Sequence, residues 1–182
     1  MEYSTDSFNK ALIFAAKAHG SQKINGSEIP YIVHPVMVAW EVISFFDHYP
    51  EEDSNLLIQT ALLHDVLEDT DVTRDELRKE FGTEVESIVM LLSREILSVH
   101  SKQKSTDEYL DGLANGPKSA QIVKMADRIV NLNPPPTHWT QKRITDYHDE
   151  LEVIYHRLNA ANPALADRLK QKIKHYKNQF VG

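Results

Sequence analysis

Cysteine is absent from the 182 residues of this chain. Disulfide bonds, zinc–thiolate clusters, iron–sulfur centres and catalysis by a thiol are therefore excluded. Long apolar runs are missing as well, because charged residues or histidines interrupt each one before the roughly 20 residues of a membrane span. The first ten residues carry Glu2 and Asp6 and no basic patch before an apolar run, so a secretory signal is not expected. We expect a cytoplasmic protein with no membrane partner.

Basic residues are also fewer than acidic ones. The 20 lysines and arginines stand against 27 aspartates and glutamates, for a formal net charge of -7. Duplex binding needs a basic stripe, so neither DNA nor RNA is expected as a partner. A small anionic ligand is still compatible with this charge, because it needs only a metal and a local group of cations. The length predicts one domain over residues 1–182.

Apolar residues recur at helical spacing along most of the chain, and alternation of period two is not seen at useful length. Thr73 with Glu76 fits a capping box, Gly82 separates two helices, and Thr137 is the expected cap after three prolines. The sequence predicts an all-α fold, a bundle of about eight to nine helices. The expected helices cover residues 6–19, 35–46, 55–68, 74–81, 84–97, 107–113, 118–132, 138–159 and 163–177.

The segment 61–69 combines an imidazole with three carboxylates. At about 100° per residue, a helix here places His64, Asp65, Glu68 and Asp69 within an arc of about 140°. The opposite side carries only leucine and valine, so the helix is expected to be mostly buried. Carboxylates clustered near a core are costly unless a cation neutralises them. A divalent metal is the simplest such cation.

The segment 118–132 is the second one that contains candidate functional residues. Asp127 and Asn131 lie one turn apart on the same face, with Lys124 and Arg128 beside them. Apolar residues form the other side. A carboxylate and an amide projecting from a buried helix suit a metal ligand and a partner for a hydroxyl group.

Three motifs occur in order along the chain: PYIVHP at 30–35, ALLHDVLEDT at 61–70 and KMADRIVNL at 124–132. Together they resemble the HD superfamily of metal-dependent phosphohydrolases, whose pattern is His, then His-Asp, then Asp. More narrowly they resemble the hydrolase domain of RelA/SpoT enzymes and the stand-alone small alarmone hydrolases. The resemblance covers about residues 11–147. It implies removal of the 3′-pyrophosphate from (p)ppGpp-type nucleotides, a phosphoric diester hydrolysis.

The resemblance also implies roles for particular residues. Manganese is the usual metal, and Fe²⁺ or Zn²⁺ also suits a mixed nitrogen and oxygen donor set. The implied metal ligands are His34, His64, Asp65 and Asp127. Glu68 and Asp69 match the acidic pair that orients or deprotonates the attacking water. The residues implied to contact the small nucleotide substrate are Lys23, Lys102, Asn131, Arg143 and Tyr147.

One loop departs from the family pattern. In RelA/SpoT hydrolases the loop after the first helix carries arginines and lysines that pack on guanine and reach the phosphates. Here residues 19–26 read HGSQKING, so only Lys23 keeps a charge, while Ile24 and Asn25 stand where cations are expected. The identity of the nucleotide base is therefore open. The guanine alarmone is the preferred substrate, and the adenine counterpart (p)ppApp or NADPH also fits.

Two further alternatives remain at this point. A metal-occupied sensor or binding module without catalysis is disfavoured by the Glu68–Asp69 pair, because a pure binder needs no poised base. The oligomeric state is open, since the lysine-bearing last helix can pack on the domain or on a second copy in a homo-oligomer. The remaining histidines, His19 among them, are expected at the surface or in packing contacts.

Overall fold

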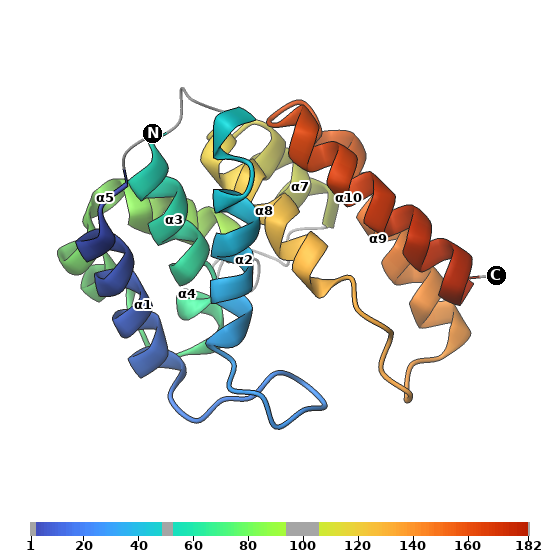
Figure 1. The fold of residues 1–182 in the computed structure, drawn as a ribbon, viewed down its shortest axis with the longest axis horizontal. Coiled ribbons are helices and arrows are strands. Elements are labelled where there is room, and N and C mark those ends of the chain that lie inside the picture. The colour runs from blue at the N-terminus through green and yellow to red at the C-terminus, as the bar shows by residue number, and fades with distance from the viewer. Residues whose placement is uncertain (1–2, 49–52, 94–105, 182) are drawn as a thin grey trace.

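The computed structural model describes residues 3–48, 53–93 and 106–181, and within them the chain is helical. The one β element in these ranges is an isolated bridge between Lys23 and Pro30. The all-α prediction is confirmed, while the division into a single domain stays a prediction. The elements in chain order are α1 (Thr5–His19), α2 (Val33–Ile43), the 3-10 turn η1 (Phe46–His48), α3 (Ser54–Leu63), α4 (Val66–Asp69), α5 (Arg74–Leu92), α7 (Thr106–Ala114), α8 (Lys118–Asn131), α9 (Gln141–Leu158), α10 (Pro163–Tyr176) and the π turn η2 (Lys177–Val181) (Figure 1).

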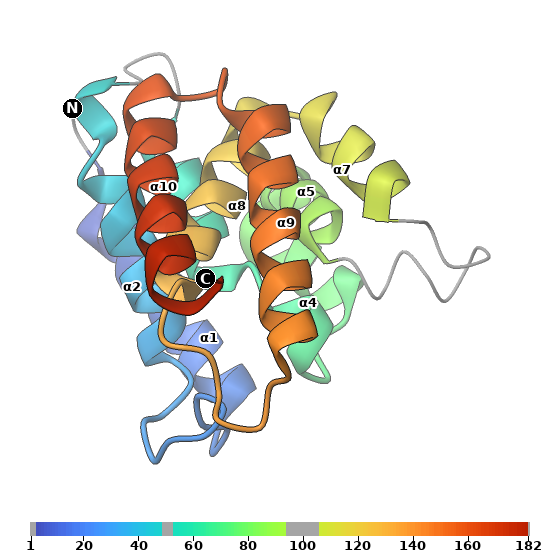
Figure 2. The same cartoon turned by 90° about the vertical axis from the view of Figure 1, so that its right-hand side faces the viewer.

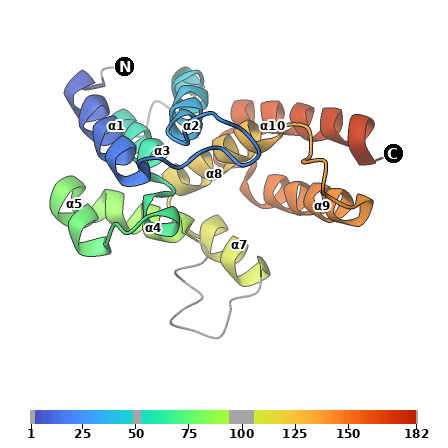
Figure 3. The same cartoon turned by 90° about the horizontal axis from the view of Figure 1, so that it is seen from below.

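Helix α8 is the centre of the fold. It contacts α2, α3, α5, α7, α9 and α10, and Figure 3 shows it between the group α1–α3 and the pair α9–α10. Ile122, Met125 and Ala126 on this helix have no exposed surface. Because α8 is enclosed in this way, any charged side chain that it turns inward needs a partner.

Two loops lie at the same end of the molecule, the lower end of Figures 1 and 2. The first joins α1 to α2 and is closed by hydrogen bonds from Tyr31 N to Gln22 O, 2.8 Å, and from Ile24 N to Ile29 O, 2.9 Å. The second joins α8 to α9 and contains the three prolines. Helix α10 packs on α8 and α9, so the lysine-bearing last helix is seated on its own chain.

Local sequence signals set most of the observed boundaries. The capping box of Thr73 and Glu76 is present at the start of α5, as predicted. Gly82 interrupts α5 with φ 87° and ψ 169°, a conformation that favours glycine, so the predicted separation of two helical segments is confirmed. The expectation that Thr137 caps the following helix is wrong. Thr140 is the cap, and its side chain accepts a hydrogen bond from Arg143 N.

The expected helix over 55–68 is not continuous. Helix α3 ends at Leu63 and α4 begins at Val66, with His64 and Asp65 between them. Asp65 has φ -103° and ψ -4°, away from regular helical values. Because of the break, α3 and α4 both bury apolar residues, while the side chains of His64 and Asp65 do not follow the spacing of one continuous helix.

Among the described helices, none is both long and apolar enough to cross a membrane.

Candidate functional site

Three segments that are distant in the sequence bring two imidazoles and two carboxylates together. His34 lies in the first turn of α2, His64 and Asp65 join α3 to α4, and Asp127 lies on α8. His34 Nε2 is 3.6 Å from Asp65 Oδ2 and 3.4 Å from Asp127 Oδ1. His64 Nε2 is 2.9 Å and 3.8 Å from the same two oxygens. The four residues predicted as metal ligands therefore form one cluster.

The spacing of these atoms suits a divalent ion. Bonds of about 2.0–2.2 Å at angles between about 90° and 110° separate neighbouring donor atoms by about 3 to 3.5 Å. The donor atoms of His34, His64 and Asp65 all lie within 4.8 Å of one another. Two imidazole nitrogens and two carboxylate oxygens also form a donor set that Mn²⁺, Fe²⁺ and Zn²⁺ accept.

His64 shows which of its nitrogens is directed at this centre. Its Nδ1 lies 2.8 Å from the carbonyl oxygen of Ala61, and a carbonyl only accepts, so Nδ1 carries the hydrogen. Nε2 is fully buried and has no hydrogen-bond partner among the described residues. In the neutral ring Nε2 carries a lone pair, and a buried lone pair that accepts no hydrogen bond destabilises the fold. The orientation is the one that a metal-binding histidine adopts when a carbonyl fixes its tautomer.

Asp127 divides its two oxygens between two kinds of partner. Oδ2 accepts hydrogen bonds from Arg128, at 3.0 Å from Nε, and lies 3.5 Å from Lys124 Nζ. Oδ1 faces the imidazoles and accepts a 2.6 Å hydrogen bond from Asn131 Nδ2. Burial opposes ionisation of this carboxyl, but the charges of Arg128 and Lys124 outweigh burial and hold the pKa of Asp127 well below its usual range.

His64 and Asp65 stabilise each other's charged forms. Burial lowers the pKa of His64, yet the carboxylate of Asp65 outweighs burial and raises the pKa to about 9. Burial raises the pKa of Asp65, while the charge of His64 outweighs burial and lowers it to about 2. The cluster thus favours a positive charge at its centre, as a metal site does.

The acidic pair lies next to the cluster on α4. Burial, and after it the charge of Asp65, raises the pKa of Asp69 above its ordinary value. A raised carboxyl pKa suits a group that accepts a proton near neutral pH. Glu68 is half-buried, and its backbone N–H donates a 3.1 Å hydrogen bond to the carbonyl oxygen of Asp65. Both residues therefore adjoin the cluster.

Comparison with known proteins agrees with this geometry. The HD domain family matches residues 11–164. The chain belongs to the HD-domain family.

The relatives of this HD domain include small stand-alone enzymes. Guanosine-3′,5′-bis(diphosphate) 3′-pyrophosphohydrolase MESH1 of Mus musculus is 30% identical over 167 residues, or 89% of this chain and 90% of the relative. The Danio rerio protein of the same name is 32% identical over 164 residues, or 87% of each chain. A solved structure described as "a metazoan ortholog of SpoT" that "hydrolyzes ppGpp" matches with a TM-score of 0.80 at 26% identity, covering 96% of this chain and 98% of the other.

The HD domain holds its cluster with a set of residues that sequence reasoning did not select. The Tyr31 hydroxyl donates a 2.6 Å hydrogen bond to Asp65 Oδ2. Gln22 Nε2 donates a 2.6 Å bond to the carbonyl oxygen of Asp69, and Gln22 Oε1 lies 2.8 Å from His19 Nδ1. The His19 ring packs on Tyr31 with centroids 4.7 Å apart. Tyr31 stands inside the first motif, so its position beside His34 was the signal available in the sequence.

The residues predicted to contact the substrate have different surroundings in the structure. Lys23 forms an ion pair with Glu28 in the loop after α1 and is half-exposed. Lys102 lies outside the described residues. The Asn131 side-chain amide is bonded to Asp127 rather than free. These three contacts stay predictions.

Arg143 and Tyr147, one turn apart on α9, share Trp139 as a neighbour. The Arg143 guanidinium lies over the Trp139 ring, 4.7 Å from its centroid. Tyr147 meets the same indole edge-on, with centroids 5.4 Å apart. Trp139 therefore contacts both predicted substrate residues.

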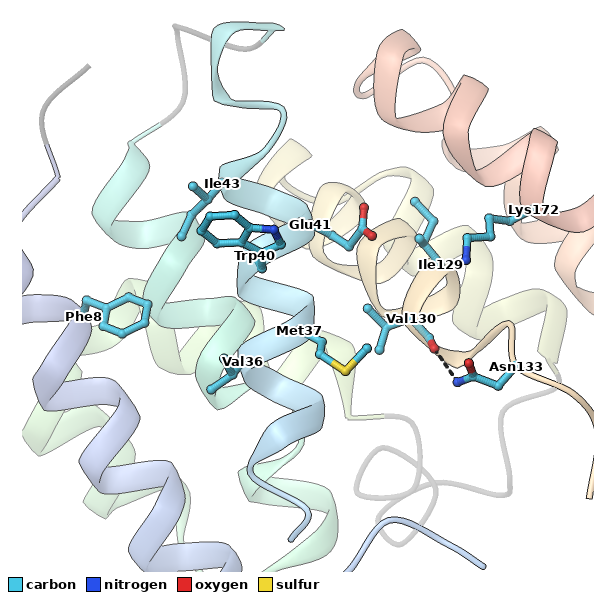
Figure 4. A pocket seen from close by; sticks show the side chains of 10 residues that line it. All are labelled: Phe8, Val36, Met37, Trp40, Glu41, Ile43, Ile129, Val130, Asn133 and Lys172. Carbon is cyan, nitrogen blue, oxygen red and sulfur yellow. Dashed lines mark hydrogen bonds between the residues drawn. The ribbon is translucent and has the colours of Figure 1, made fainter. Parts of the chain in front are cut away.

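An apolar groove elsewhere on the HD domain has a volume of about 330 Å³ and is formed by α1, α2, α8 and α10. Figure 4 shows Met37 and Trp40 projecting from α2 along it, with Val130 and Asn133 at the other end. None of the metal-cluster residues lines it. The candidate site is therefore the cluster between α2, α4 and α8, and not this groove.

Proposed function

We propose that this HD domain is a metal-dependent hydrolase that removes the 3′-pyrophosphate from (p)ppGpp-type nucleotides. The observation that carries the proposal is the cluster of His34, His64, Asp65 and Asp127 with an acidic pair directly beside it. The curated relatives and the solved structure are enzymes described by that activity. A small nucleotide is the expected partner.

His34, His64, Asp65 and Asp127 would hold the ion, and Mn²⁺ is the proposed occupant. A bound divalent ion supplies hydroxide near neutral pH by lowering the pKa of a coordinated water. His64 Nε2 is the donor whose orientation supports this assignment most directly. Fe²⁺ and Zn²⁺ suit the same donors.

Asp69 is the proposed proton acceptor, and Glu68 the residue that orients the attacking water. Asp69 is held by the bond from Gln22 to its backbone, and its raised pKa favours uptake of a proton. Its carboxylate can accept the proton from the water and later release it to solvent. Arg143 offsets negative charge on the substrate's phosphate groups.

The purified protein should release pyrophosphate from ppGpp when Mn²⁺ is present, and a chelator should stop the release. Asp69→Asn is expected to lower kcat by about 10²–10⁴, the usual contribution of an acid–base group. Metal content measured on the same sample should be unchanged, because Asp69 is not a proposed ligand. Asp71→Asn, two residues away on the following turn, is the matched control. Absence of pyrophosphate release by the wild type with Mn²⁺, Fe²⁺ and Zn²⁺ would exclude the proposed activity.

A second substrate class is favoured by one observation. Lys23, the single cation in the loop after α1, is paired with Glu28, and no other cation of that loop is available to a guanine base or its phosphates. The adenine alarmone (p)ppApp or the 2′-phosphate of NADPH would use the same hydrolytic centre. Ranking ppGpp, ppApp and NADPH by kcat/KM decides between them, and a preference for ppGpp above about tenfold removes the second class.

A further inference from the structure

Arg143 carries a charge that no carboxylate neutralises in the part of the chain that the structure describes. Its neighbour Lys142 pairs with Asp146 at 2.5 Å, whereas no ion pair involves the Arg143 guanidinium. The contact that the guanidinium does make is the one with the face of Trp139. In a chain of net charge -7, an arginine without an acidic partner is available to an anionic ligand.

Trp139 has contacts through both its backbone and its ring. Its backbone N–H donates a 2.9 Å hydrogen bond to the carbonyl oxygen of Pro136, which sets the turn before α9. The edge of its ring meets Tyr147 at an interplanar angle of 76°. Tyr147 in turn packs on Tyr176 of α10, with centroids 5.8 Å apart. The indole face that Arg143 meets is thus backed by Tyr147 and, through Tyr147, by α10.

The pair of Arg143 and Trp139 is carried by an element that packs on the metal cluster's own helix. Helix α9, which bears Arg143 and Tyr147, packs against α8, which bears Asp127. Trp139 lies just before α9 and contacts both residues. A substrate whose scissile phosphate faces the cluster can extend another phosphate toward Arg143.

We propose that Trp139 is a positioning residue that holds Arg143 against its ring so that the guanidinium N–H groups face a phosphate of the substrate. Stacking uses only the flat face of a guanidinium, and its five N–H donors lie in the plane and stay available. Such a group binds phosphate in a bidentate manner. This inference rests on the proposed function, because it assigns a role toward that substrate.

Kinetics of paired variants test the inference. Trp139→Leu keeps apolar bulk and removes the aromatic face, so KM for ppGpp should rise about tenfold while kcat changes less than about threefold. Trp139→Phe keeps a face and should restore KM to within about threefold of the wild type. Arg143→Ala should raise KM at least as much, and adding Trp139→Leu to it should have no further effect. Additive effects on KM, or a fall confined to kcat, would overturn the proposal.

Tryptophan fluorescence provides a readout that does not depend on turnover. The chain has two tryptophans, Trp40 and Trp139, and Trp40 lies on α2 with 68% of its surface exposed. In Trp40→Phe, which is expected to keep full activity, titration of chelator-treated protein with ppGpp should change the Trp139 emission with saturation. In Trp139→Phe, which retains Trp40, the emission should stay constant. An unchanged Trp139 emission at saturating ppGpp would also overturn the proposal.

The two proposals fail in different ways. If wild-type protein hydrolyses no alarmone yet inorganic pyrophosphate or ppGpp saturates the Trp139 signal, the proposed reaction is wrong and the phosphate-facing stack is retained. If hydrolysis is normal and Trp139→Leu leaves KM unchanged, the reaction is retained and the positioning role is wrong. Thermal unfolding of Trp139→Leu, compared with Trp139→Phe, shows whether lost packing accounts for a change in KM.

Discussion

The Tyr31 hydroxyl donates a 2.6 Å hydrogen bond to Asp65 Oδ2, the oxygen that also lies 2.9 Å from His64 Nε2. This bond links the segment before α2 to the junction of α3 and α4. Residues 34 positions apart are thereby held at the same carboxylate. Partners of this kind orient a ligand and are often needed almost as much as the ligand itself.

Tyr31→Phe should therefore weaken metal binding or lower activity by about 10- to 100-fold. The aromatic packing against His19 and His34 is kept, so the fold should be unaffected. Mn²⁺ titration followed by pyrophosphate release measures both quantities. Tyr155→Phe, a half-buried tyrosine on α9, is the control. Wild-type metal affinity together with wild-type turnover in Tyr31→Phe would show that the hydroxyl has no such role.

Mn²⁺ should stabilise the folded protein, because an ion that binds only the native state adds about 2.7 kcal/mol at 100 times its Kd. His64→Gln removes a proposed ligand and should abolish the rise in Tm that Mn²⁺ causes. His156→Gln, at an exposed position on α9, should leave the rise intact. Differential scanning calorimetry with and without Mn²⁺ measures each shift against the same variant. Equal shifts in all three proteins would contradict the ligand assignment.

The metal-free protein should lose stability as the pH rises from about 6.5 to about 9. The folded-state pKa of His64 is raised to about 9 by Asp65, against burial, and the unfolded value is about 6.5. A group with a raised folded pKa contributes fully below the unfolded pKa, and the contribution is lost as the pH rises through the folded pKa. The loss is on the order of a few kcal/mol.

Urea unfolding of chelator-treated protein at pH 6.5, 7.5 and 9 measures this loss. His64→Gln removes the titrating ring, so the difference between wild type and variant isolates its contribution from that of other groups. The difference should shrink toward pH 9. A pH-independent difference would show that His64 is not protonated in the metal-free fold.

Replacing either of two glycines by alanine should change the free energy of unfolding, and the two changes should have opposite signs. Gly82 has φ 87°, which alanine adopts only with strain, and Gly82→Ala should lower the free energy of unfolding by more than about 1 kcal/mol. Gly112 lies inside α7, where an added Cβ meets only Leu91 at 3.9 Å. Gly112→Ala should raise the free energy of unfolding by up to about 1 kcal/mol. Urea denaturation compares the two, and equal effects would refute the backbone argument.

Local sequence determined much of this fold. Helix ends follow from contacts within a few residues, such as the Thr73–Glu76 box, and Gly82 interrupts α5 because its own backbone conformation differs. The three motifs also identified the residues that cluster, since each motif carries its imidazole or carboxylate at a fixed position. The all-α class followed from helical spacing of apolar residues alone.

Tertiary structure decided what those residues contact. Helical periodicity assumes a continuous helix, so it could not show that α3 and α4 separate at His64 and Asp65. The division of Asp127 between cations on Oδ2 and imidazoles on Oδ1 depends on how α2 packs on α8. The stack of Arg143 on Trp139 depends on a turn whose cap lies three residues later than expected. The contact between His34 and Asp127 joins segments that are distant in the sequence, and its energy leaves no periodic signal there.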